Sequence, residues 1–169
     1  MFFFILAGLV FLVLLFSFVP RRELRTEIEI AAPSSAIWAV LRDFPAYADW
    51  NPFITHIEGD LRMGAKLKVR LASHGGAART FNPLLLSVDP GILIRWRGRL
   101  GLPRLFDGEH YFALVPSGEG TRFVHGESFS GALLWIVNTG RFEADFRAMN
   151  EALKARVENA AAKEISASD

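Results

Sequence analysis

The chain has 169 residues, of which 51% are hydrophobic and 22% are charged, and its formal net charge is +1. This length suits one domain with an appendage, and the balanced charge excludes a highly charged disordered chain and a basic nucleic-acid-binding protein. The chain has no cysteine, which excludes disulfides, thiol nucleophiles and thiolate metal sites.

The first predicted element is an uninterrupted apolar run, FFFILAGLVFLVLLFSFV, over residues 2–19. As a helix it would span about 27 Å, close to the ~30 Å hydrocarbon core of a bilayer. It predicts a single-pass transmembrane anchor over residues 1–20. Because Arg21 and Arg22 follow at once, the positive-inside rule places the remaining domain in the cytoplasm. A cleaved signal peptide is the alternative, but the run lacks a positive n-region and an A-x-A-like cleavage site.

The next segment predicts one strand followed by two short helices. LRTEIEI, residues 24–30, alternates between apolar and polar side chains as a half-buried strand does. APSSAIWAVLRDF, residues 32–44, has proline and serine at its start and apolar residues at helical spacing. Pro45 ends that helix, and AYADWNPFI leaves room for one further helical turn before Pro52.

A run of strands joined by turn residues is predicted over the middle of the chain. Their sequences, in order, are AKLKVRLA (65–72), RTFNPLLLSVD (79–89), GILIRWRGRL (91–100), LFDGEHYFALV (105–115) and TRFVHGESF (121–129). Pro83 predicts an edge position or a bulge, because proline cannot donate a hydrogen bond to a sheet. Residues 117–120 predict a hairpin turn between the last two strands.

The chain returns to helical spacing at its end. Within residues 138–159, one apolar stripe is formed by Phe142, Phe146, Met149, Leu153 and Val157. This spacing predicts a long amphipathic helix, followed by a frayed tail over residues 161–169. Strands followed by a segregated long helix indicate an α+β fold.

The order of several stretches resembles the START-like SRPBCC superfamily, in particular its polyketide cyclase/dehydrase-like members. The stretches that carry the resemblance lie within residues 24–158: DFPAYADWNPFI, IRWRGRLG, FDGEHYFAL, GTRFVHGESFSG and MNEALKARVEN. The resemblance implies one domain over residues 21–160 with a helix-grip fold, a curved antiparallel sheet of about seven strands around the C-terminal helix. It also implies a hydrophobic cavity between sheet and helix for lipids, sterols, polyketides or other apolar molecules.

Strand parity predicts the geometry of the hairpin GEHYFALVPSGEGTRFVHGESFSG. If Pro116 pairs with Thr121, then Phe112 lies opposite His125 and His110 lies opposite Glu127 on the inward face. Three interpretations remain open: His110 and Glu127 satisfy each other in the core, they orient a carbonyl or hydroxyl group of a ligand, or they act as a general base in a cyclisation or dehydration. In the enzymatic case the catalytic residues would be His110, His125 and Glu127. The chain offers no distinctive nucleophile or oxyanion hole, which favours binding over catalysis.

The predicted ligand-binding residues combine inward aromatic positions with this polar cluster. They are Trp50, Phe53, Trp96, His110, Phe112, His125, Glu127, Phe129, Phe142, Phe146 and Met149. The segment DWNPF is either a cavity wall or a turn in which Trp50 packs and Asn51 caps the backbone. The loop LGLPRLF, residues 100–106, is either ordinary loop packing or a rim of the cavity mouth.

A row of basic side chains on the outer sheet face, including Arg95, Arg97 and Arg99, is either a solvated face or a surface for anionic lipid. No spacing matches a metal site or a cofactor-binding motif, so neither a metal nor a cofactor is predicted. The sequence therefore predicts a protein that binds a hydrophobic small molecule or lipid at the membrane, with no nucleic-acid partner. The alternatives are a cyclase/dehydratase-like enzyme and a protein-interaction module whose cavity is filled by its own side chains.

Overall fold

A computed structural model describes residues 4, 8, 19–72 and 77–168. The predicted anchor at residues 2–19 therefore lies almost entirely outside the described residues. Among the residues that are described, no helix is both long enough and apolar enough to cross a bilayer.

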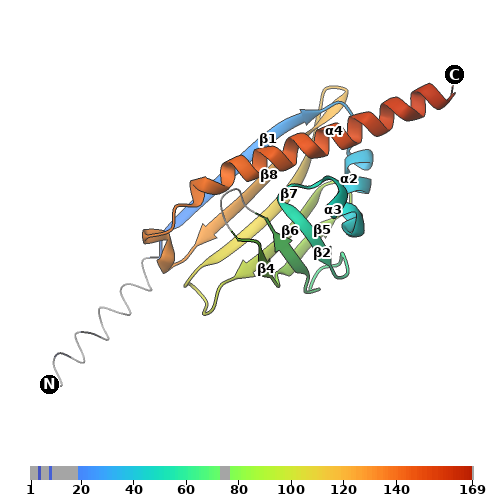
Figure 1. The fold of residues 1–169 in the computed structure, drawn as a ribbon. Coiled ribbons are helices and arrows are strands. Elements are labelled where there is room, and N and C mark those ends of the chain that lie inside the picture. Colours follow the sequence, from blue (N-terminus) through green and yellow to red (C-terminus); the bar gives the residue numbers. More distant parts are fainter. Residues whose placement is uncertain (1–3, 5–7, 9–18, 73–76, 169) are drawn as a thin grey trace.

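The described chain folds into α+β architecture with the predicted order of elements (Figure 1). Its strands are β1 (Arg21–Ile30), β2 (Ile54–Glu58), β3 (Lys68–Leu71), β4 (Arg79–Phe81), β5 (Leu84–Asp89), β6 (Leu93–Arg99), β7 (Asp107–Ser117) and β8 (Gly120–Ser130). Its helices are α2 (Ser34–Arg42), α3 (Tyr47–Trp50) and α4 (Glu143–Ser168), with 3-10 turns η1 (Phe44–Ala46), η2 (Ala132–Trp135) and η3 (Thr139–Phe142). The short helices after the first strand are thus confirmed.

The antiparallel strands form two sheets instead of one sheet of about seven strands. The larger has the order β1-β8-β7-β6-β5, and the smaller has the order β2-β3-β4. Pro83 is the physical reason for the extra strand, because it has no N–H to donate and separates β4 from β5. The sheets are joined through the segment before β3, where the N–H of Leu67 donates to the Pro83 carbonyl at 2.9 Å and Lys66 bridges Leu84.

Helix α4 lies alongside β1 and packs on one face of the larger sheet, as the apolar stripe predicts (Figure 1). The side chains of Phe146, Met149, Leu153 and Val157 are all buried in the core. The helix is also tied to the end of β1, where the Glu158 carboxylate accepts the N–H of Ala31 at 2.9 Å.

The helix departs from the prediction at both ends. Phe142 belongs to η3, so the α-helix begins one residue later, at Glu143. At the other end α4 continues to Ser168, through residues expected to form a frayed tail. The run of three alanines at 160–162 accounts for this extension, because alanine has the highest intrinsic helix propensity.

Candidate functional site

The register of the β7–β8 hairpin confirms the predicted pairs. Pro116 lies opposite Thr121, Phe112 opposite His125, and His110 opposite Glu127. Ser117 also pairs with Gly120, so the loop is shorter than predicted. Because one face of both strands packs against α4, apolar burial selects this register, and a slip by one residue would turn the inward set toward solvent.

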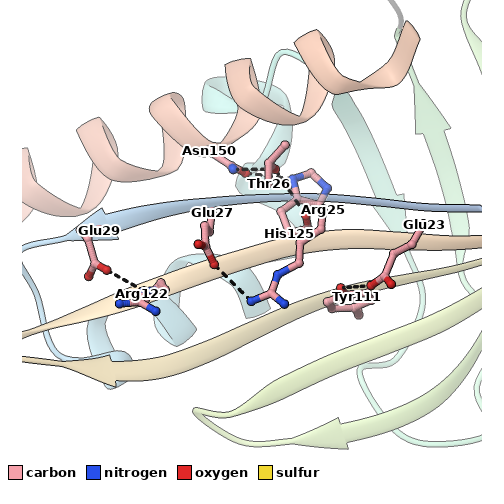
Figure 2. A network of polar contacts seen from close by, with 9 residues as sticks. All are labelled: Glu23, Arg25, Thr26, Glu27, Glu29, Tyr111, Arg122, His125 and Asn150. Carbon is pink, nitrogen blue, oxygen red and sulfur yellow. Dashed lines mark hydrogen bonds and ion pairs between the residues drawn. The ribbon is translucent and has the colours of Figure 1, made fainter. Parts of the chain in front are cut away.

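Five polar side chains form one continuous chain of contacts that runs from β7 and β8 through helix α4 to β1. They are Glu127, His110, His125, Asn150 and Thr26. The His110 Nδ1 atom lies 3.4 Å from Glu127 Oε2, and the Nε2 atoms of His110 and His125 are 3.1 Å apart. His125 Nδ1 lies 2.9 Å from Asn150 Oδ1, and Asn150 Nδ2 donates to Thr26 Oγ1 at 2.9 Å. Figure 2 shows Asn150 reaching from α4 toward Thr26 and His125.

With every group uncharged, the donors and acceptors of this chain allow one arrangement of protons that satisfies every contact. The Thr26 hydroxyl donates to the backbone carbonyl of His125 at 3.3 Å, so it accepts from the Asn150 amide nitrogen. The Asn150 oxygen then accepts Nδ1–H of His125, and the bare Nε2 of neutral His125 accepts Nε2–H of His110. The bare Nδ1 of His110 needs a donor, and the carboxylic acid form of Glu127 supplies it. All the hydrogen bonds therefore point from the Glu127 carboxyl group toward β1.

The electrostatics favour the same uncharged state. Burial raises the pKa of the Glu127 carboxyl to about 8 and lowers the pKa of His110 to about 3. Burial, together with the neighbouring His110 ring, also lowers the pKa of His125 well below its usual range. Each shift has the same physical cause, because an apolar environment penalises the charged form of a side chain.

Aromatic rings hold both imidazoles in place. The His110 ring stacks on Trp96 with 4.7 Å between ring centroids, and the His125 ring stacks on Phe146 at 3.8 Å. Trp96 stands directly opposite His110 on the neighbouring strand β6, so the stack follows from strand pairing. These contacts fix the orientation in which the ring nitrogens meet their partners.

The Glu127 carboxyl group has space because residue 108 is glycine. A Cβ atom at Gly108 would collide with Oε1 of Glu127. The Glu127 side chain is 21% exposed, and it lines a partly open cavity together with Gly108. The Oε2 atom of Glu127 faces His110, which leaves Oε1 as the carboxyl oxygen at the cavity wall.

The cavity has a volume of about 100 Å³ and is lined mainly by apolar side chains. It is smaller than the ~300–1,000 Å³ typical of sites for drug-sized ligands, so without rearrangement it suits a compact molecule. Its lining residues are Phe53, Ile54, Val69, Leu71, Phe81, Pro83, Trp96, Gly98, Arg99, Leu100, Phe106, Gly108, His110, Glu127, Phe129 and Phe142.

The cavity wall contains part of the predicted ligand-binding set. The predicted residues that line it are Phe53, Trp96, His110, Glu127, Phe129 and Phe142. The others lie outside the wall: Trp50, Phe112, His125, Phe146 and Met149. Four of these five are fully buried in the core, and Trp50 packs against Tyr47 with 5.1 Å between ring centroids.

In the segment DWNPF the turn interpretation and the cavity-wall interpretation each account for some residues. The Asn51 side chain accepts the N–H groups of Phe53 and Ile54 at 3.0 and 2.8 Å, which is backbone capping. Phe53 is part of the cavity wall, whereas Pro52 is exposed. This turn therefore fixes the start of β2 so that Phe53 points inward.

Sequence reasoning missed Asn150, Thr26 and the wall contributed by the small sheet. Asn150 carried a signal, because it stands four residues after Phe146 on the inward side of the helix, where a polar side chain needs a buried partner. Thr26 likewise occupies an inward position of its strand. Alternation in β3 predicts that Val69 and Leu71 point inward, but the place of these residues and of Phe81 in the cavity wall depends on how the two sheets meet.

The outer arginines of β6 are paired with acidic groups. Arg99 contacts Asp107 at 2.8 Å, and Arg97 contacts Glu109 at 3.6 Å. Figure 2 shows further pairs on this outer face, including Arg122 with Glu29 and Tyr111 with Glu23. The row predicted as a basic surface is therefore largely neutralised by its neighbours.

A curved antiparallel sheet packed around a long C-terminal helix defines the helix-grip fold. The residues that line the cavity belong to strands of both sheets and to flanking loops, and none belongs to α4, so this cavity lies between the sheets and not between sheet and helix as the resemblance implies. The chain belongs to the family described as polyketide cyclase/dehydrase and lipid transport, whose model matches residues 21–158. No curated protein matches the chain.

Several solved structures share the fold at low sequence identity. The chain is similar to the Zhui aromatase/cyclase from a Streptomyces species, with 18% identity and a TM-score of 0.65, over 82% of this chain and 94% of that one. It is also similar to the protein TTHA0849 from Thermus thermophilus, with 20% identity and a TM-score of 0.65, over 82% of this chain and 99% of that one. A third similar structure is norcoclaurine synthase from Thalictrum flavum in complex with dopamine and hydroxybenzaldehyde. Its sequence identity is 16% and its TM-score is 0.64, over 87% of this chain and 92% of that one.

Proposed function

We propose that this protein binds a compact hydrophobic molecule carrying a hydroxyl group, which donates its hydrogen bond to Oε1 of Glu127. The observation that carries the proposal is the position of the Glu127 carboxyl group in a cavity wall whose other side chains are apolar except for Arg99 and His110. The only proton of the neutral carboxyl group is engaged by His110, so Oε1 offers an acceptor and no donor. A hydroxyl group matches it, whereas the oxygen of a carbonyl group would face another acceptor.

The second part of the proposal is that this binding takes place at a membrane. Residues 2–19 form an apolar run long enough to cross a bilayer, and they precede β1 with only Pro20 between them. We infer that this run anchors the domain in a membrane with the domain on the cytoplasmic side. The family description includes lipid transport, which supports a role in holding or passing on a membrane-soluble compound.

A panel of bicyclic compounds of similar size tests the binding mode: 1-naphthol, naphthalene and 1-tetralone. With the full-length protein in nonionic detergent, titration calorimetry should show 1-naphthol binding roughly threefold to tenfold more tightly than naphthalene, the range expected from one net hydrogen bond. A leucine in place of Glu127 should abolish that preference. Equal affinity of the wild-type protein for naphthol and naphthalene would refute the role of Glu127.

A filled-cavity variant tests the location. Gly98 lines the cavity and has open space around its Cβ direction, so Gly98→Val should reduce naphthol affinity at least tenfold by occupying the site. Ser128→Val, at an exposed position of β8 outside the cavity wall, is the matched control and should bind as the wild type does. If Gly98→Val binds normally, the ligand lies elsewhere.

An enzyme of the cyclase type is the second candidate, favoured by one specific observation. The Glu127 carboxyl has a pKa of about 8, faces an apolar cavity and is hydrogen-bonded to a histidine pair. In its ionised form it would be a stronger base than an ordinary carboxylate and so suited to removing a proton from a bound hydroxyl or carbon acid. The Streptomyces aromatase/cyclase that shares the fold adds support for this class of chemistry.

Glu127→Gln separates the two functions. Glutamine can donate to His110 and present an oxygen to the cavity, so naphthol binding should persist. It cannot exchange a proton, so turnover of any polyketide-like substrate should be lost. A variant that retains full turnover would exclude Glu127 as the base.

A further inference from the structure

Four large apolar side chains stand exposed on two loops at one end of the domain. Leu100 and Leu102, in the β6–β7 loop, are 46% and 70% exposed, and Trp135 and Ile136, after β8, are 68% and 82% exposed. We call these four residues the apolar rim. Single exposed apolar residues are common on protein surfaces, but a group on adjoining loops marks an interaction site.

The two loops of the apolar rim are held together by the backbone. The N–H groups of Ala132 and Leu133 donate to the carbonyls of Arg104 and Leu105 at 2.9 and 3.0 Å. Gly131 permits this approach, because a Cβ atom there would collide with the carbonyl of Leu105. The rim is therefore one preformed surface.

The apolar rim lies where the apolar run of residues 2–19 joins the domain. The N–H of Gly131 donates to the carbonyl of Pro20 at 3.3 Å, so the start of the domain touches the loop that leads to Trp135. In Figure 1 the beginning of β1, the start of α4 and the β6–β7 loop share one end of the molecule, and the C-terminus lies at the other.

Cationic side chains border the apolar rim. Arg21 and Arg22 are exposed at the start of β1, and exposed Arg141 lies over the ring of Phe142 at 4.8 Å. Apolar side chains with an arginine border suit a surface of anionic lipid, where the rings and aliphatic chains enter the headgroup region and the guanidinium groups meet phosphates. The rim is much smaller than a stable protein interface, which takes about 20–30 residues a side.

The apolar rim also borders the cavity. Leu100 belongs to both, and Phe106 and Phe142 line the cavity from the same two connections that carry the rim. We infer that the apolar rim docks on the surface of an anionic lipid bilayer and thereby places this side of the cavity against the membrane. The inference deepens the proposed function and rests on its membrane part.

The four tryptophans of the chain make the docking measurable. Residues 2–19 contain no tryptophan, and of Trp38, Trp50, Trp96 and Trp135 only the last is exposed. The full-length protein, reconstituted in vesicles of phosphatidylcholine and phosphatidylglycerol, should lose part of its fluorescence when the lipids carry brominated chains. Trp135→Phe should lack the quenched component, and vesicles of phosphatidylcholine alone should quench less.

A matched pair of variants tests the surface. Leu102→Asp combined with Ile136→Asp should abolish the quenching of Trp135. Met63→Asp should retain it, because Met63 is an apolar residue of similar exposure, 72%, in the β2–β3 connection and outside the rim. Naphthol affinity in detergent should be unchanged in both, which shows that each variant is folded.

The outcomes distinguish the inference from the proposed function. If the protein floats with the vesicles but brominated lipid leaves Trp135 unquenched, docking is refuted while the anchor and the binding site stand. If the protein does not float with vesicles, the membrane part of the proposed function fails and the inference fails with it. If Leu102→Asp with Ile136→Asp instead breaks a dimer seen by sedimentation in detergent, the rim binds a second copy and the inference is overturned.

Discussion

The Glu127 carboxyl should make the protein less stable as the pH rises from about 4.5 to about 8. Its pKa is about 8 in the folded protein, against an ordinary value of 4.5, so the folded state binds more protons than the unfolded state between these values. Stability from this group therefore falls as the pH rises through that window. His110 and His125 act in the opposite direction, because their folded pKa values are lowered, and their contribution is complete above pH 6.5.

Glu127→Gln isolates this effect between pH 6.5 and 8. One proton costs about 1.4 kcal/mol per pH unit, so the wild type should lose up to about 2 kcal/mol over this interval. For a chain of this size that is a fall of roughly 4–8 °C in the melting temperature. The variant lacks the titrating group and keeps both hydrogen-bonding partners, so the difference in stability between the two proteins should narrow by up to about 2 kcal/mol as the pH falls from 8 to 6.5.

The measurement is thermal unfolding of the full-length protein by circular dichroism, in nonionic detergent, at several pH values. Glu109→Gln is the control, because that carboxylate points outward beside Arg97 and should leave the pH profile of the wild type unchanged. An infrared titration should also show a protonated carboxyl band that persists at pH 7 and is missing from Glu127→Gln. Parallel pH profiles for the wild type and Glu127→Gln would refute the neutral carboxyl group.

Two further substitutions test the packing of the site, both read out by the same melts. Asn150→Ala leaves the Nδ1–H of His125 buried without an acceptor and should cost about 1–3 kcal/mol, while Asn159→Ala, exposed on the same helix, should cost less than ~0.5 kcal/mol. A similar cost for both would mean that solvent satisfies the imidazole. Gly108→Ala forces a methyl group against the carboxyl end of Glu127, so the carboxyl group must move away from His110, and the lost hydrogen bond should destabilise the protein. Gly98→Ala, on the same rung of the sheet with open space around it, should be tolerated, and equal losses would contradict the collision.

The spacing of apolar residues along the sequence predicted the features that depend on a single element or on two neighbouring elements. The inward face of β1, the stripe of α4 and the rungs of the β7–β8 hairpin follow from periods of 2 and 3.6 residues together with a short turn. The pairing of His110 with Glu127 was therefore accessible from parity alone. The fold class followed from the order of the elements and from the family resemblance.

The cavity could not be located in the same way, because its wall is assembled from distant segments. Val69 and Phe81 reach it only because Pro83 splits the strands and the smaller sheet closes against β5. The same limit explains why His125 was expected in the wall. Parity gives its side of the sheet, but only the placement of Phe146 shows that the ring is covered.

Because all these hydrogen bonds point in one direction, the protonation state of Glu127 at the cavity affects the hydrogen bonds that helix α4 makes. If Glu127 loses its proton, His110 must carry hydrogen on Nδ1, and two bare Nε2 atoms would then face each other across 3.1 Å. To remove this contact between two acceptors, His125 must move its hydrogen from Nδ1 to Nε2. The Asn150 amide must then rotate so that its nitrogen donates to His125, and the Thr26 hydroxyl must donate to the Asn150 oxygen instead of to the backbone carbonyl of His125. Ionisation of Glu127 beside the ligand would thus change the hydrogen bond between Asn150 of α4 and Thr26 of β1, although two imidazole rings lie between them and Glu127.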